Sequence, residues 1–166
     1  LRPGHLVVTR DHGPQPVRWT GARRCDGRTR LAPVRFAAGV MRNRQPLYLS
    51  PQHRVLISSL TAAVCFDNAE VLAPAINLVG QPGITRDPRL TVAYHHILFD
   101  RHELIMSAGT WTESFLPGAF GLSTLYDAQC EELFALFPHL RADAMTYGPA
   151  ARHMLAGREM ALLQVA

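Results

Sequence analysis

The 166-residue chain contains no lysine, so all 17 of its basic side chains are arginine. The arginines are spread along the chain, with a denser stretch from Arg18 to Arg44, and the formal net charge is +4. A nucleic-acid-binding domain more often concentrates its basic side chains on one face and interleaves them with aromatic residues. The composition therefore predicts a solvated basic surface and no nucleic-acid partner.

Cysteine is also scarce, and long apolar runs are missing. Cys25, Cys65 and Cys130 are odd in number, far apart and without Cys-x-x-Cys spacing, which excludes a disulfide framework and a zinc knuckle. Cys65 stands among apolar residues and is expected to be a small buried side chain. No apolar run approaches the roughly 20 residues that span a bilayer. We therefore expect no membrane partner.

What remains is the composition of a globular domain. Hydrophobic residues make up 48% of the chain and charged residues 18%, and a chain of this length can bury a sizeable core. The sequence starts at Leu1 and not at a methionine, in the middle of a motif. We expect it to be a piece of a longer protein whose upstream part precedes Leu1.

Short β-branched and aromatic runs separated by turn residues follow one another through the first two-thirds of the chain. They predict strands at residues 6–9, 16–20, 34–37, 47–49, 54–57, 71–74 and 76–79, and a hairpin of residues 91–99 and 103–108 that turns near Asp100 and Arg101. Strands at such short intervals favour an all-β domain over βαβ units.

The character of the chain changes after Phe115. Ser123 is a suitable N-cap for a helix over residues 124–137, which Pro138 would end. A second helix is predicted over residues 149–163, with Pro149 in its first turn. The predicted organisation is a β-domain over residues 1–122 and a helical carboxy-terminal extension over residues 123–166 that packs on it.

The segment from residue 94 to 105 concentrates polar groups in a run that otherwise predicts buried β-structure. It contains His95, His96, Asp100, His102 and Glu103. Burying a polar side chain without a partner costs about 1–3 kcal/mol, so several such residues together indicate a site. Strand alternation places His95 and His96 on opposite faces, so only one can face a common site. Asp100 could belong to the site or cap the turn.

A second candidate precedes the strand at residues 54–57. Ser50 and His53 flank a turn stiffened by Pro51, which can hold an imidazole still, although His53 alone is more readily structural. Three histidines and a carboxylate could also bind zinc and make a metal-dependent hydrolase. The chain lacks the helical His-x-x-x-His spacing of such sites, so we predict neither a metal nor a cofactor.

Several longer motifs occur in a fixed order along the chain. They are Gly4-x-Leu6-Val7-Val8-Thr9-Arg10-Asp11-His12-Gly13-Pro14-Gln15-Pro16-Val17-Arg18-Trp19, Ser50-Pro51-Gln52-His53-Arg54-Val55-Leu56, Tyr94-x-His96-x-Leu98-x-Asp100-x-His102-Glu103, Ala108-Gly109-x-x-Thr112-Glu113-Ser114-Phe115, Leu136-Phe137-Pro138 and Tyr147-Gly148-Pro149-Ala150-Ala151-Arg152. Together they resemble the bacterial Hint domains of the hedgehog/intein superfamily, from Leu1 to about Leu163.

The resemblance implies an all-β Hint fold with a helical tail, and self-processing. In such domains a Cys or Ser attacks the carbonyl that precedes it, by an N-to-S or N-to-O acyl shift. Ser50 and His53 match the element that strains the scissile amide, with His53 as general acid. His95 or His96 occupies the region beside the nucleophile. His102 matches the histidine that assists carboxy-terminal cleavage in splicing members, two residues after Asp100.

Departures from the family pattern limit what the resemblance implies. The nucleophile is expected upstream of Leu1, which would leave this piece inactive alone, and His5 stands where relatives usually carry Asp. Glu113-Ser114 stands where splicing inteins carry His-Asn, and neither side chain cyclises like Asn. Cleavage without splicing is therefore expected. The implied partners are the chain's own upstream polypeptide and a thiol or other acyl acceptor, in an exported bacterial parent. A non-catalytic structural or interaction module is the alternative.

Overall fold

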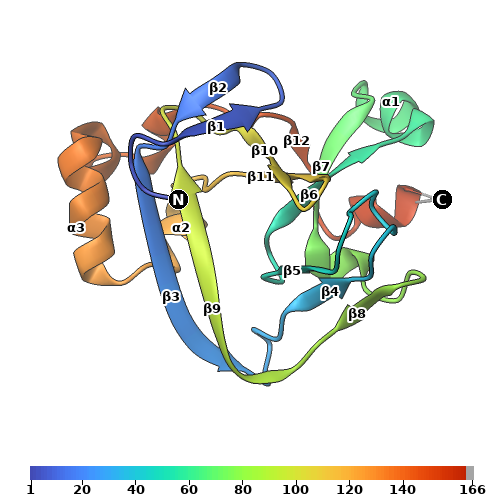
Figure 1. Cartoon of the computed structure of the whole chain (residues 1–166). Helices are drawn as coiled ribbons and strands as arrows, with labels where there is room; N and C mark the ends of the chain where they lie inside the picture. The colour runs from blue at the N-terminus through green and yellow to red at the C-terminus, as the bar shows by residue number, and fades with distance from the viewer. Residues whose placement is uncertain (164–166) are drawn as a thin grey trace. The chain divides into compact units, whose positions relative to one another are not determined.

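The computed structural model describes residues 1–163 of the chain and shows a mostly β protein, with 34% strand and 23% helix (Figure 1). The prediction of an all-β fold with a small helical part is confirmed. The chain packs as two compact units. Unit 1 contains Leu1–Arg24, Ala93–Ile105 and Ser114–Ala151, and unit 2 contains Cys25–Val92, Met106–Glu113 and the described residues from Arg152 onward.

Unit 1 begins with a tight antiparallel pair, β1 (Leu6–Thr9) and β2 (Gly13–Pro16). The hydroxyl of Thr9 closes their turn, because it donates to the carbonyl of Gly13 at 2.8 Å and accepts from the backbone N–H of His12 at 3.2 Å. On its other side β1 pairs with β10 (Leu104–Ser107), with Thr9 opposite Ile105. The three strands bring His12 and Glu103, the residue before β10, into one region.

The longest strands of the protein are β3 (Trp19–Gly27) and β9 (Arg89–Leu98), which pair with each other (Figure 1). This pairing corrects two predictions. The strand at residues 16–20 does not stop at Gly21, because β3 continues to Gly27. Residues 91–99 and 103–108 do not form a hairpin, because β9 pairs with β3 while β10 pairs with β1.

The helices of unit 1 differ from the predicted one. The chain forms α2 (Ala119–Ser123) and α3 (Asp127–Leu136), followed by two 3-10 helices, η2 (Pro138–Arg141) and η3 (Ala144–Tyr147). Ser123 is not an N-cap, because it is the last residue of α2 and its hydroxyl donates back to the carbonyl of Phe120 in the same helix. The backbone N–H of Tyr126 instead donates to the side-chain oxygen of Gln129 at 3.1 Å.

An aromatic core joins these helices to the strands of unit 1. Its buried members are Trp19, Leu98, Phe115, Leu125, Leu133, Phe137, Leu140 and Tyr147. The indole N–H of Trp19 donates to the carboxylate of Glu132 at 3.0 Å, which ties β3 to α3 while the ring stays buried. Trp19 therefore contributes an apolar ring to the core while its N–H has a hydrogen-bond partner.

Unit 2 contains two groups of strands. The first is the antiparallel sheet β5-β4-β8, formed by β4 (Val34–Phe36), β5 (Leu47–Leu49) and β8 (Ile84–Arg86). In the second, β6 (Arg54–Ser58) pairs antiparallel with both β7 (Glu70–Pro74) and β11 (Thr110–Glu113). Both groups contribute to the core of unit 2, whose buried residues include Val34, Phe36, Val55, Ile57, Val71, Ala73, Leu78 and Ile84.

Three further predictions in unit 2 are wrong. Residues 76–79 do not form a strand, because the chain turns as the 3-10 helix η1 (Ala75–Leu78). Cys65 is exposed, on the unpredicted helix α1 (Leu60–Phe66). Residues 149–163 do not form one helix: β12 (His153–Met154) pairs parallel with β7, and the 3-10 helix η4 (Glu159–Leu162) follows.

The division at residues 1–122 and 123–166 stays a prediction, and residues 164–166 lie outside the described part of the chain. Residues 123–151 pack within unit 1, whereas the described residues from Arg152 onward pack within unit 2. Within residues 1–163, no helix is both long enough and apolar enough to cross a bilayer.

Candidate functional site

The predicted site residues are divided between the two units. Ser50 and His53 belong to unit 2, and His95, His96, Asp100 and His102 belong to unit 1. Within each unit, the strands and turns around these residues determine what each side chain contacts.

Backbone hydrogen bonds fix the turn that carries His53. The backbone N–H of His53 donates to the carbonyl of Ser50 at 3.0 Å, and its own carbonyl accepts from Ala75 at 2.9 Å. The carbonyl of Pro51 accepts from the backbone N–H of Ile76 at 2.9 Å, so two N–H groups of η1 hold the turn in place. Nε2 of His53 is buried. The imidazole of His53 is therefore attached to a backbone segment that hydrogen bonds hold in place.

A buried carboxylate holds the residue that follows His53. Oε1 of Glu113 accepts from the backbone N–H of Arg54 at 2.9 Å, and the Arg54 guanidinium lies 3.4 Å from the same oxygen. Glu113 reaches this position because β11 pairs with β6, with Thr112 opposite Val55. From the sequence, Glu113 is only a departure from the splicing pattern. A carboxylate in a strand with buried neighbours was the signal for this anchoring role.

The two adjacent histidines of β9 lie on opposite faces of the strand, as predicted. His95 is exposed, whereas His96 is partly buried with its ring centroid 4.8 Å from that of Phe115 and tilted by 59°. The backbone N–H of Phe115 donates to the carbonyl of Ile97 at 2.8 Å, which fixes this contact. Of the pair, His96 is the one directed toward the aromatic core of unit 1.

Asp100 and His102 have different surroundings. Asp100 is exposed, and its carboxylate lies 3.3 Å from Nε of Arg18, a solvated ion pair worth less than about 1 kcal/mol. His102 is buried, and its Nδ1 accepts from the backbone N–H of Ala151 at 3.1 Å. An accepting Nδ1 places the proton of a neutral imidazole on Nε2. His102 thus anchors the segment that follows η3.

Glu103 is the most deeply buried charged residue of this segment, with 1% of its surface exposed. Its Oε2 lies 2.9 Å from Nδ1 of His12, and its backbone N–H donates to the hydroxyl of Ser114 at 2.9 Å. No role is predicted for His12 from the sequence. The signal for the pair was Glu103 itself, because a glutamate in a buried strand needs a partner.

A family model of the Hint domain matches residues 1–119 of the chain. The chain belongs to the Hint-domain family. No curated protein and no solved structure matches it. The matched range includes all six predicted site residues and ends at the first residue of α2. Hint domains are autoprocessing domains, which gives the general kind of function for this chain.

The cysteines of this Hint domain do not form a cluster in the part that the structure describes. Within residues 1–163 none of the three forms a disulfide, and Cys65 is exposed while the other two are partly buried. Burial raises the pKa of the Cys130 thiol, with Asp127 and Glu131 adding to the effect. A raised pKa lowers the thiolate fraction, which is the nucleophilic form. Cys130 therefore lacks the environment of an activated nucleophile.

The histidines of this Hint domain are not arranged as metal ligands within the described residues. Across residues 1–163, no group of three or more His, Cys, Asp or Glu side chains is placed to hold a metal ion. The ring nitrogens described above contact protein groups: Nδ1 of His12 contacts a carboxylate, and Nδ1 of His102 contacts a backbone amide.

Proposed function

We propose that this Hint domain cleaves a peptide bond upstream of itself by an N-to-S or N-to-O acyl shift, without splicing. The Cys or Ser that follows the scissile bond attacks the carbonyl carbon, so a C–S or C–O bond forms as the C–N bond breaks. The nitrogen leaves as an amine after it receives a proton. A thiol or another nucleophile then attacks the resulting thioester or ester and releases the upstream polypeptide.

His53 is proposed as the general acid that protonates the leaving nitrogen. The observation that carries this role is the fixed turn from Ser50 to His53, which the backbone of η1 holds on one side and the Glu113 carboxylate on the other. A general acid must lie within hydrogen-bond reach of the atom it protonates, so a rigid support favours this function. Glu113 is a positioning residue in this scheme.

The structure also supports the absence of splicing. Carboxy-terminal release in splicing domains needs an Asn that attacks its own backbone carbonyl. At the corresponding place, Glu113 accepts hydrogen bonds from Arg54, and the Ser114 hydroxyl accepts from the backbone N–H of Glu103. Both side chains hold strands together, and neither is an amide.

The test expresses the full natural reading frame with a reporter fused upstream. Purified protein is incubated with dithiothreitol or hydroxylamine, and the fragments are weighed by mass spectrometry. We expect one cleavage junction immediately before a Cys or Ser, and loss of cleavage in His53→Ala. His95→Ala is the matched control, because His95 is an exposed histidine of the same domain. An intact protein under every thiol condition would instead support a non-catalytic Hint module.

A further inference from the structure

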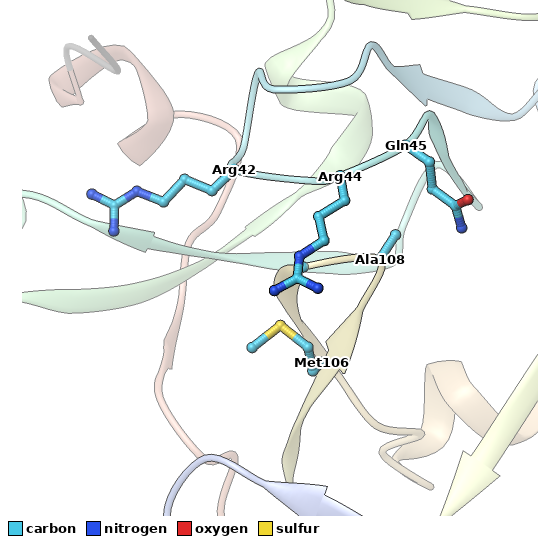
Figure 2. Close-up of a pocket in the computed structure, with 6 residues that line it drawn as sticks. Arg42, Arg44, Gln45, Met106 and Ala108 are labelled. Atoms are coloured by element: carbon cyan, nitrogen blue, oxygen red, sulfur yellow. The ribbon is translucent and has the colours of Figure 1, made fainter.

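Unit 2 contains a hollow of about 550 Å³ that is separate from the Ser50–His53 turn. It is lined by Arg42, Arg44, Gln45, Met106, Ala108 and Gly109 (Figure 2). These residues come from the loop between β4 and β5, from strand β10 and from the turn between β10 and β11. The proposed cleavage reaction uses none of them.

The loop that carries the two arginines is fixed from inside by Asn43, which is 2% exposed. The side-chain amide of Asn43 donates to the carbonyls of Ala37 at 2.8 Å and Gln45 at 2.9 Å, and its oxygen accepts from the backbone N–H of Met41 at 3.0 Å. A buried amide with these contacts holds both ends of the loop together. The residues on either side of it project outward.

The loop is also tied to the β10–β11 turn. The backbone N–H of Arg44 donates to the carbonyl of Ala108 at 2.7 Å, and the hydroxyl of Thr110 donates to the carbonyl of Met41 at 2.8 Å. Gly109 has a φ of +101°, and a Cβ there would lie 3.0 Å from the carbonyl oxygen of Arg42. Only glycine permits this close approach without strain.

Two non-glycine residues of the hollow adopt left-handed backbone conformations, Arg42 with a φ of 61° and Ala108 with a φ of 53°. A side chain in this conformation is strained, because its Cβ crowds the backbone. Strain of this kind persists where the surroundings over-determine the backbone, as they do at ligand clamps. The walls of the hollow are thus formed before any ligand arrives.

The hollow is positively charged. Arg42 and Arg44 are both exposed, and within residues 1–163 no carboxylate lies at ion-pair distance from either guanidinium. In Figure 2 the Arg44 guanidinium lies over the side chain of Met106, whereas that of Arg42 points away from it. The two cations do not converge on one point. A ligand that pairs with both arginines therefore carries two separated anionic groups.

We propose that this hollow binds an acidic peptide segment. One carboxylate pairs with Arg44, a second pairs with Arg42, and an aliphatic side chain beside the first carboxylate lies on the exposed Met106. Arginine forms bidentate pairs with carboxylates. A single phosphate would need converging arginines. A nucleic-acid strand would use aromatic side chains for stacking, and none lines the hollow.

The test measures binding of a fluorescently labelled synthetic peptide of alternating glutamate and leucine to the full chain, by anisotropy at low salt. A twin with glutamine in place of glutamate is the neutral probe. We expect binding of the acidic peptide alone, weakened about tenfold in the double variant Arg42→Gln/Arg44→Gln. Arg30→Gln is the control for net charge, because Arg30 is exposed but does not line the hollow.

A second measurement follows the methionine methyl groups of the unmodified chain by NMR during the same titration. We expect the Met106 signal to shift and the other four methionine signals to stay in place. The proposal is wrong if the neutral twin binds equally, or if Arg30→Gln weakens binding as much as the double variant. It is also wrong if inorganic phosphate or an oligonucleotide shifts Met106 at the same concentration as the peptide.

Discussion

Nδ1 of His12 lies 2.9 Å from Oε2 of Glu103, although 91 positions separate the two residues in the sequence. The imidazole is partly exposed, whereas the carboxylate is almost fully buried. The other carboxylate oxygen of Glu103 is also buried and has no hydrogen-bond partner within the described residues. His12 is therefore the main polar contact of the Glu103 carboxylate, whose burial is energetically unfavourable.

The first prediction concerns the stability of this pair. His12→Ala should lower the free energy of unfolding by about 1–3 kcal/mol, because it leaves a buried acceptor without its partner. Urea denaturation of His12→Ala, Glu103→Gln and the double variant measures the coupling. We expect the two losses to be non-additive by more than about 0.5 kcal/mol. Strict additivity would show that the contact contributes nothing.

The second prediction concerns Gly21, which lies beside the indole of Trp19. A Cβ at position 21 would be 2.6 Å from the ring atom Cζ2, and the buried ring is held by Glu132. Gly21→Ala should therefore lower the unfolding free energy by about 1–3 kcal/mol through overpacking. Gly118→Ala is the control, since a Cβ at Gly118 meets nothing within 4 Å. Equal losses in thermal denaturation would contradict the packing argument.

The third prediction is a loss of stability at alkaline pH. Burial raises the pKa of Tyr147 far above its usual value of 10.0, and its hydroxyl donates to the carbonyl of Phe99 at 2.8 Å. Above pH 10 the unfolded chain loses this proton while the folded chain keeps it, so unfolding becomes more favourable as pH rises. The contribution is fully present below pH 10.

Tyr147→Phe tests this assignment. The variant should lose about 1 kcal/mol at neutral pH, where the hydrogen bond is intact in the parent chain. The free energy of unfolding of the variant should then fall less steeply above pH 10. Circular dichroism follows unfolding, and the absorbance of phenolate follows tyrosine ionisation. The same alkaline slope in both proteins would assign the effect to another group.

The fourth prediction separates the two neighbouring histidines of β9. If the proposed cleavage occurs, His96→Ala should slow it by at least about tenfold, whereas His95→Ala should leave its rate unchanged. The reason is that His96 faces the aromatic core beside Phe115, while His95 is exposed. Fragment release over time, measured by gel densitometry, gives both rates. A slower His95→Ala variant would place the reaction on the other face of the strand.

Some of the fold could be predicted because the signals are local. Residues 47–49 and 54–57 are apolar runs bounded by proline or polar turns, and they appear as β5 and β6 with nearly the predicted bounds. The alternation that separates His95 from His96 is equally local. A short apolar run alone does not distinguish a strand from a turn of helix, which explains the error at η1.

Other features depend on partners far along the chain. β12 exists because residues 153 and 154 align with residues 71 and 72 of β7, and no local pattern announces this pairing. The same holds for β9, which pairs with β3 and not with its neighbour in sequence. In the site, the turn of Ser50 and His53 could be predicted, but the support from Glu113 depends on the register of β11 against β6.

The proline content of β2 has a consequence for self-association. Val17, just after β2, donates its N–H to the carbonyl of His5 and accepts from the N–H of Gly4. Backbone groups alternate in direction along a strand, so the backbone groups of Pro14 and Pro16 face the outer side of β2, away from β1. That outer side ends the strand order of the sheet and has no N–H at either proline. An approaching strand would find acceptors there but no donors. This end of the sheet thus resists templating fibrils, even with Leu6 and Val8 exposed on the adjoining strand.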